Sequence, residues 1–318
     1  MMNGMKEIIR RIVSSIVLII VVSFITFFML MMIPGDAVEI SLGTEATPER
    51  VRELRAALGM DAPWYTQYLS WLTHAITGDF GVSFTYGETV TSLLTSRLPV
   101  TLSLMVMAII IAVLALTIGV FAALKQNKTF DIIARTLMQI GDAMPQFWIA
   151  LIFLVYISAQ FDVFPISGFT PFTESVYGGF MSLLLPALVL AFGMIATLIR
   201  IVRSSMLHSL KQDYMLMTRV SGMNPVVAII KYPLRDALIA PLTVIGIQIA
   251  GLISGVIVVE SIFSLPGVGR LLFSAVLKRD LFLILGLVSF IVTSVIIITL
   301  ITDILYILLN KRMRREES

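Results

Sequence analysis

Residues 12–33 read IVSSIVLIIVVSFITFFMLMMI, an almost uninterrupted apolar run that is followed by Pro34 and Gly35. A helix rises about 1.5 Å per residue, so roughly 20 apolar residues cross the ~30 Å hydrocarbon core of a bilayer. The run is too long for the core of a signal peptide, and no small-residue cleavage pattern follows it. We therefore expect an uncleaved first transmembrane helix.

Five further apolar runs follow along the chain, at 99–124, 145–159, 183–201, 239–262 and 281–309. The whole chain is 58% hydrophobic and 14% charged, with a mean hydropathy of +0.97. In a typical soluble domain, about a quarter of all residues are charged. Composition and runs together predict an all-α, polytopic membrane protein with about six transmembrane helices.

Proline residues predict where several of these helices begin. Pro99, Pro145 and Pro241 are expected in the first helical turn, where the missing N–H costs no hydrogen bond. Pro186 lies inside its run and predicts a kink or a later start of that helix.

The distribution of lysine and arginine predicts the orientation, because these residues stay on the cytoplasmic side of span ends. They gather in the N-terminal tail, in the loop 125–135 and in the segment 200–235, whereas 160–180 has none. Both termini are therefore expected in the cytoplasm. The segment 261–280 is expected outside the cytoplasm although it carries basic residues, because the charges of the other loops together favour this orientation.

These assignments divide the chain into four segments. Residues 1–33 form a cytoplasmic tail and the first helix, and 34–98 form an extracytoplasmic segment with short helices. Residues 99–310 form a core of five helices that includes a cytoplasmic loop, 207–238, and 311–318 form a cytoplasmic tail. Within the second segment, Thr47 as N-cap, Pro48 at the first position and Gly59 past the end predict a short helix.

Sequence signatures of catalysis are missing. The chain has no cysteine, no phosphate-binding loop and neither H-E-x-x-H nor G-x-S-x-G. Its two histidines, His74 and His208, lie in polar segments that we place on opposite sides of the membrane. We expect no catalytic residue, no metal site and no cofactor bound by this chain. The basic excess flanks the apolar runs, which indicates topology rather than nucleic-acid binding.

Polar residues concentrate in the fifth run, where Thr243, Gln248 and Ser254 accompany Gly251 and Gly255. Two interpretations are equally open. The glycine pair permits a close helix–helix contact, whereas a glutamine inside a span needs a partner or a wet cavity. The three polar residues are therefore a candidate translocation path.

The loop 207–238 is too polar to span and too regular for a linker. A helical pattern in it ends at Gly222, and Asn224-Pro225 can start a second helix that runs to Lys231. Two short helices joined at a glycine predict a compact knob suited to docking a partner.

Several spaced motifs resemble the oligopeptide/dipeptide/nickel branch of binding-protein-dependent ABC transporter permeases. The loop has the form D-Y-x-x-x-x-R-x-x-G, and Leu234 keeps the spacing of the family's closing I-x-L-P. Its Glu-Ala-Ala positions are instead Leu216, Met217 and Thr218, and the closing proline position is Arg235. The other matching motifs are Pro34-Gly35-Asp36, Leu58 to Pro63, Gln67-Tyr68, Gly78 to Gly81, and Glu260 to Gly269.

The resemblance implies a type I importer permease fold in the plasma membrane of a bacterium or archaeon. The implied partners are a second homologous permease, two ABC ATPase subunits that carry ATP and Mg, an extracytoplasmic substrate-binding protein and the lipid bilayer. The loop would then be the ATPase-coupling element, with Asp213, Tyr214, Thr218, Arg219, Gly222, Met223, Asn224, Pro225 and Leu234. Oligopeptides or dipeptides are the expected cargo, with nickel or a metal chelate as an alternative; a stand-alone carrier, or a channel, is a further alternative.

Overall fold

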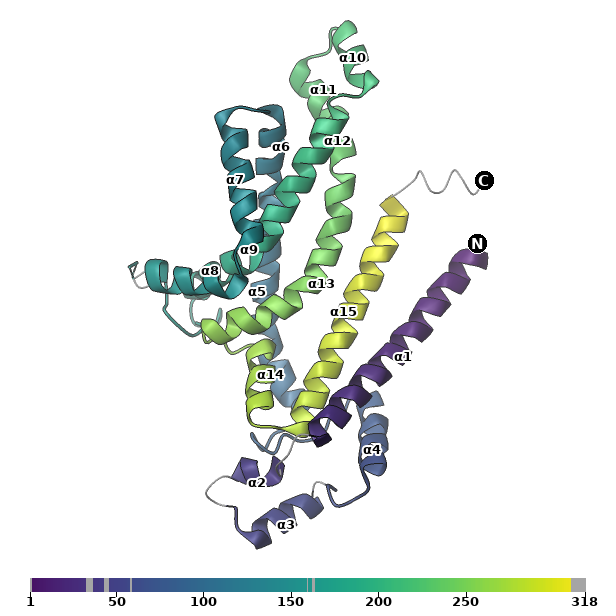
Figure 1. Cartoon of the computed structure of the whole chain (residues 1–318), viewed down its shortest axis with the longest axis vertical. Coiled ribbons are helices and arrows are strands. Elements are labelled where there is room, and N and C mark those ends of the chain that lie inside the picture. The colour runs from purple at the N-terminus through teal and green to yellow at the C-terminus, as the bar shows by residue number, and fades with distance from the viewer. Residues whose placement is uncertain are drawn as a thin grey trace. The chain divides into compact units, whose positions relative to one another are not determined.

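The computed structural model describes residues 2–32, 37–42, 46–57, 59–158, 160–161 and 164–309 (Figure 1). The motif Pro34-Gly35-Asp36, Leu58 and the tail 311–318 lie outside these residues. Helices make up most of these described residues. This confirms the predicted all-α class.

Within the described ranges, five helical stretches are long and apolar enough to cross a membrane. They are α1 (Met2–Met32), α5 with α6 (Val90–Leu114, Leu116–Leu124), α9 (Val176–Ser209), α13 (Ile239–Ile262) with the short helices before it, and α15 (Leu281–Leu309). A sixth span results if α7 (Thr129–Ala143) is joined to α8 (Gln146–Ile152) and its π-helical continuation η2 (Phe153–Ser158). The predicted count of about six therefore depends on this pair.

The third predicted run, 145–159, is not one straight span. Its apolar stretch is preceded by α7, and the axes of α7 and α8 differ by 109°. The cause lies at Pro145, which lacks an N–H and disfavours helical backbone in the residue before it. Met144 is accordingly extended, with φ −91° and ψ 125°.

The prediction for Pro99 was wrong, because α5 begins nine positions earlier at Val90 and contains Pro99 in its interior. Val90, Leu93 and Leu94 are buried, at the i, i+3, i+4 spacing of one helix face. Burial of this face extends the helix toward the N-terminus. Pro186 also lies inside its helix, whereas Pro241 is the third residue of α13, as expected.

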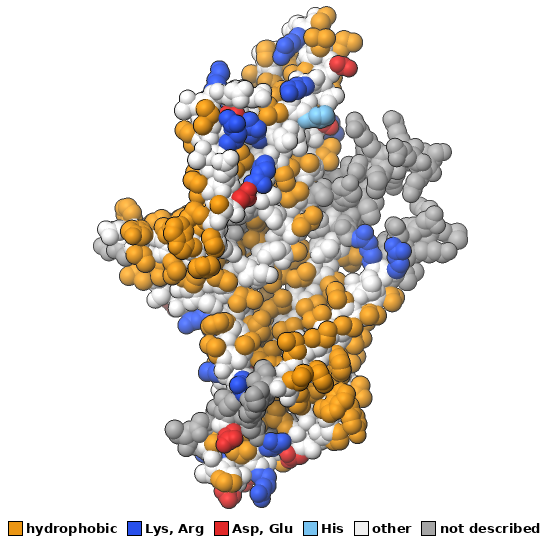
Figure 2. Space-filling model, viewed as in Figure 1, with side chains coloured by type: hydrophobic (Ala, Val, Ile, Leu, Met, Phe, Trp, Pro, Cys, Tyr) orange, Lys and Arg blue, Asp and Glu red, His pale blue; other side chains and the backbone are white. Residues whose placement is uncertain are grey.

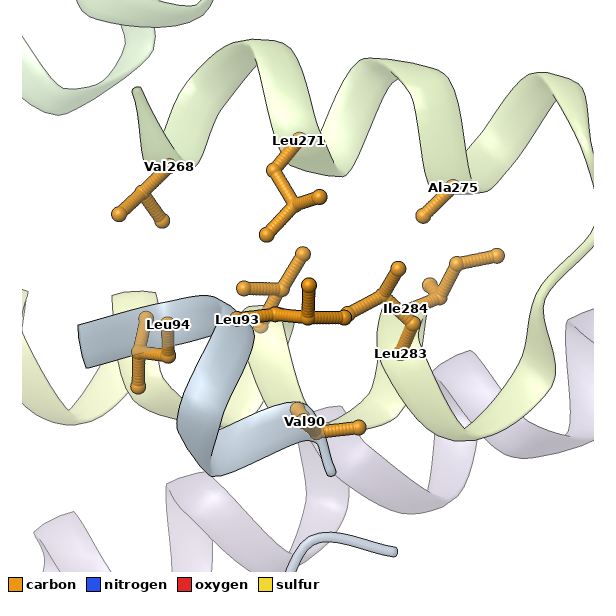
Figure 3. Close-up of a cluster of buried hydrophobic side chains, with 9 residues drawn as sticks. Val90, Leu93, Leu94, Val268, Leu271, Ala275, Leu283 and Ile284 are labelled. Atoms are coloured by element: carbon orange, nitrogen blue, oxygen red, sulfur yellow. The ribbon is translucent and has the colours of Figure 1, made fainter. Parts of the chain in front are cut away.

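The described residues form two compact units. The first comprises Met1–Thr101 and Pro266–Ile296. Its core joins α14 (Val268–Leu277) to the beginnings of α5 and α15, and Figure 3 shows the cluster: Val90, Leu93, Leu94, Val268, Leu271, Ala275, Leu283 and Ile284. A buried carboxylate, Asp280, accepts hydrogen bonds from Ser83 Oγ (2.5 Å) and from the Thr85 N–H (3.1 Å). Segments far apart in the sequence are thereby linked.

The short helices of the first unit include α2 (Ala37–Leu42), α3 (Pro48–Ala57) and α4 (Trp64–Ile76). The predicted helix after Thr47 is confirmed as α3. Thr47 Oγ1 accepts a hydrogen bond from the Arg50 N–H (3.4 Å), and Gly59 has a positive φ of 66°.

The second unit comprises Leu102–Leu265 and Ile297–Ser318. Helix α9 is its centre and contacts α6, α7, α8, α13 and α12 (Pro233–Ala237). Helices α10 (Asp213–Val220) and α11 (Pro225–Lys231) protrude beyond one end of α9 and α13 (Figure 1). We call α10, α11 and α12 together the knob.

Candidate functional site

The turn between α10 and α11 is built as the sequence predicts. Gly222 has φ +69°, its N–H donates to the Arg219 carbonyl, and the Met223 N–H donates to the Thr218 carbonyl, both over 3.1 Å. This pair of bonds is a Schellman motif, which satisfies the last carbonyls of α10. A left-handed residue is required at its centre, and glycine adopts that conformation without strain.

The next helix is started by Asn224. Its Oδ1 accepts a hydrogen bond from the Val226 N–H (2.9 Å), and Pro225 occupies the first helical position. Capping and proline together fix the direction in which α11 leaves the turn. The turn between the two short helices is therefore closed by a helix C-cap on one side and an N-cap on the other.

The interior of the knob holds Thr218 and an aromatic pair. Thr218 is buried and its hydroxyl donates to the Met215 carbonyl (2.9 Å). The rings of Tyr214 and Tyr232 lie 6.0 Å apart, so they join α10 to the end of α11. Asp213 and Arg219 are exposed on α10. The turn residues predicted from the sequence therefore lie together.

Leu234 has a different place, in the anchor of the knob on the rest of the unit. It packs with Ala237 of α12 against Met206 of α9 and Ala123 of α6. Next to this cluster, Ser209 Oγ donates to Asp236 Oδ2 over 3.0 Å. The knob is therefore joined to α9 through packed side chains and this hydrogen bond.

The surface of the knob exposes apolar side chains on α10 and α11, beside charged residues such as Asp213 and Arg219. Residues four apart lie on the same face of a helix. Leu216 and Val220 form such a pair on α10, and Val226 and Ile230 form one on α11. The apolar side chains that are more than half exposed are Leu216, Met217, Val220, Val226, Val227 and Ile230. We call these six the apolar knob face. Exposed apolar patches outside a bilayer mark interaction sites.

A buried ion pair ties α7 to α9. Asp131 is fully buried and accepts hydrogen bonds from Arg203 Nε (2.5 Å) and Nη2 (2.9 Å). The backbone N–H of Asn127 also donates to it (2.9 Å). This ion pair was missed because lysine and arginine were interpreted from the sequence as markers of topology. The signal that could have predicted it is an acidic residue, Asp131, in the first turn of a helix that follows a basic loop.

A cavity of about 350 Å³ lies where α7 bends into α8, beside α9 and α13. The side chains and glycines on its wall that matter here are Asp142, Gln146, Gly193, Thr197, Gln248 and Gly251. Of the candidate path residues, Gln248 lines it. Ser254 is exposed and does not line it, and the side chain of Thr243 lies outside the described residues. Gln146, Thr197 and Asp142 were missed, because the bend at Pro145 was not predicted.

Gly251 and Gly255, two of the three glycines of α13, have different surroundings. A Cβ at Gly255 would lie 2.6 Å from Gln146 Oε1 and 2.9 Å from a methyl of Leu190, so this glycine permits close packing. A Cβ at Gly251 would meet no atom within 4 Å, and the same holds for Gly193 on α9. Gly255 therefore fits the packing interpretation, whereas Gly251 lines the cavity, and the translocation path stays a prediction.

Comparisons with known proteins agree over most of the chain. Residues 115–315 match the family described as "Binding-protein-dependent transport system inner membrane component", and residues 4–105 match its N-terminal counterpart, "Binding-prot-dependent transport system membrane comp, N-term". The dipeptide transport system permease protein DppB of Escherichia coli K12 is 34% identical, with 98% of this chain and 100% of that protein covered. A provisionally named peptide transport system permease of Brucella abortus is 36% identical, with 96% and 98% covered.

The fold is also found among solved structures. The crystal structure of an amino acid ABC transporter with histidines matches 68% of this chain and 94% of its own chain, with a TM-score of 0.50 and 16% identity. At this identity the likeness supports the fold alone.

Proposed function

The chain belongs to the family of binding-protein-dependent transport system inner membrane components, and on that premise we propose that it is a membrane-spanning subunit of an ATP-driven peptide importer. The names of its relatives, a dipeptide permease and a peptide permease, support the cargo. The knob carries the proposal, because a rigid, apolar docking element anchored on the central helix is what an external motor requires. ATP and Mg would be bound by partner ATPases.

The partners follow from the same proposal. Two ATPase subunits, a second homologous permease and an extracytoplasmic binding protein complete the machine, and the second permease closes the path. The knob is placed in the cytoplasm and both termini with it. Within the second unit, Figure 2 shows Lys and Arg around the end that carries the knob and the α6–α7 turn, which supports a cytoplasmic knob.

The experiment that tests the assembly is affinity purification of the tagged chain from native membranes in mild detergent, followed by mass spectrometry. Two phosphate-loop ATPase chains and a second permease are expected with it. A chain that emerges alone, or only with itself, would refute the proposal and favour a stand-alone carrier.

Polar substitution on the apolar knob face is expected to weaken ATPase binding about tenfold per position. Burying an apolar side chain of this size contributes about 1.5–3 kcal/mol, and 1.4 kcal/mol corresponds to a factor of ten. Val220→Ser and Val226→Ser are the variants, and the dissociation constant for the ATPases in detergent is the measurement. Lys211→Ser, exposed before α10, is the control. Equal binding by all three variants would exclude this face as the docking surface.

Filling the cavity is expected to reduce uptake about tenfold or more without loss of assembly. In Gly251→Leu the new Cβ lies where no atom is within 4 Å, and the longer side chain is expected to extend into the cavity and reduce its volume. ATP-driven uptake of a labelled peptide into proteoliposomes is the measurement. Thr136→Leu, exposed on α7 and outside the cavity wall, adds bulk elsewhere. Unchanged uptake with Gly251→Leu would show that the path runs elsewhere.

A further inference from the structure

The wall of the cavity combines apolar residues and glycines with four polar side chains, and its charge is balanced. Asp142 is the one ionisable side chain among the described residues that line it. Its carboxylate forms an ion pair with Arg200 of α9, which neutralises the charge. The other polar side chains of the wall, Gln146, Gln248 and Thr197, are uncharged. The cavity therefore presents hydrogen-bonding groups without a net charge.

The two amides approach the cavity from different helices. Gln146 is the first residue of α8, directly after the bend, and Gln248 lies on α13 three residues before Gly251. A glutamine amide has two donor hydrogens and an acceptor oxygen, which is the same inventory as a peptide N–H and C=O. Gly193 and Gly251 leave the helix backbone uncovered between them, so another backbone can approach closely.

We propose that this cavity binds the main-chain amide groups of the transported peptide, through Gln146 and Gln248, and does not select for side-chain charge. The inference rests on the proposed function, because it takes a peptide as the cargo. Main-chain groups are common to all peptides, so a wall that recognises them accepts many sequences. A fixed charge here would instead discriminate, since two charges interact strongly where water is partly excluded.

The test measures charge selectivity rather than total uptake. The intact complex, isolated through a tag on this chain, is reconstituted with saturating binding protein. ATP-driven uptake of Ala-Lys-Ala, Ala-Ala-Ala and Ala-Asp-Ala is then compared. The affinity of the binding protein for each peptide is measured separately. The peptide concentrations are then chosen so that the same fraction of the binding protein carries each peptide. The readout is the ratio of anionic to cationic uptake.

For the wild type this ratio is expected to stay within about twofold of one, because the wall is neutral. Gln248→Glu and Gln146→Glu are expected to lower it about tenfold, since a like charge facing the peptide disfavours the anion. Gln248→Lys is expected to raise it by a similar factor. The matched control is Gln139→Glu, the same chemical change at an exposed position of α7 outside the cavity wall, which should leave the ratio unchanged.

The outcomes separate the two proposals. If the wild type imports peptides with ATP but the Gln146 and Gln248 variants keep its ratio, the cavity does not contact the cargo and this inference fails alone. A control that shifts the ratio as much as Gln248→Glu would also overturn it, because surface charge would then suffice. If the wild type shows no ATP-dependent uptake, the proposed function fails, and the inference with it.

Discussion

Gly222→Val is expected to abolish ATP-driven uptake while leaving membrane insertion intact. Gly222 has φ +69° at the centre of the turn between α10 and α11. For a β-branched residue this conformation costs about 1–3 kcal/mol, and the turn can relieve the strain by changing its angle. The apolar knob face would then be split between two misaligned helices. Uptake into proteoliposomes and the amount of protein in the membrane are the two measurements.

Gly222→Asn is the matched variant that isolates the backbone effect. Asparagine tolerates the left-handed region better than other side chains, and the Cβ position of Gly222 has no atom within 4 Å. This variant should therefore keep most of the uptake. Full activity of Gly222→Val would contradict a coupling role for the turn. If both variants were completely inactive, the loss would come from added bulk against a partner beside this turn and not from backbone strain.

Asp131→Asn is expected to lower the free energy of unfolding by about 3–5 kcal/mol, because it leaves Arg203 without its buried partner. Asp131 is fully buried and accepts two hydrogen bonds from that guanidinium. Equilibrium unfolding of the purified chain in mixed micelles measures the change. The effect should appear without any ATPase present.

Asp142→Asn provides the control, since it breaks an ion pair whose side chains are 40% and 52% exposed. Exposed pairs contribute about 0–1 kcal/mol. A double variant, Asp131→Asn with Arg203→Gln, should recover part of the loss, because no charge remains buried and unpaired. Equal small effects at Asp131 and Asp142 would show that burial of the first pair contributes little.

The knob illustrates what can be predicted from local sequence. Gly222, Asn224 and Pro225 each act on the residues beside them, through a left-handed φ, a cap and a fixed φ. Neighbouring residues therefore suffice to predict the turn and both flanking helices. The same holds for α3, which lies between its cap Thr47 and Gly59.

The cavity illustrates the opposite case. Gln146, Thr197 and Gln248 lie on three helices, and no local signal shows that they share a wall. Their meeting depends on the 109° bend after Ala143, which was missed because Pro145 was interpreted as the start of a span rather than as a break between two helices. Gly251 and Gly255 also look alike in sequence. Only their neighbours in the structure show that Gly251 borders open space and that Gly255 is in close contact with Gln146 and Leu190.

The sequence by itself determined the class of the protein, the approximate position of every span except the bent third one, its positive loops and the turn of its knob, because hydrophobic length, charge position and turn chemistry act over a few residues. Tertiary structure alone decided that residues 266–296 pack with the N-terminal part rather than with the core they follow in the chain. It also decided that Asp131 pairs with Arg203 and that Gln248, not Ser254, lines the cavity. These are contacts between distant residues, and they depend on how helices pack against one another, which no short stretch of sequence contains.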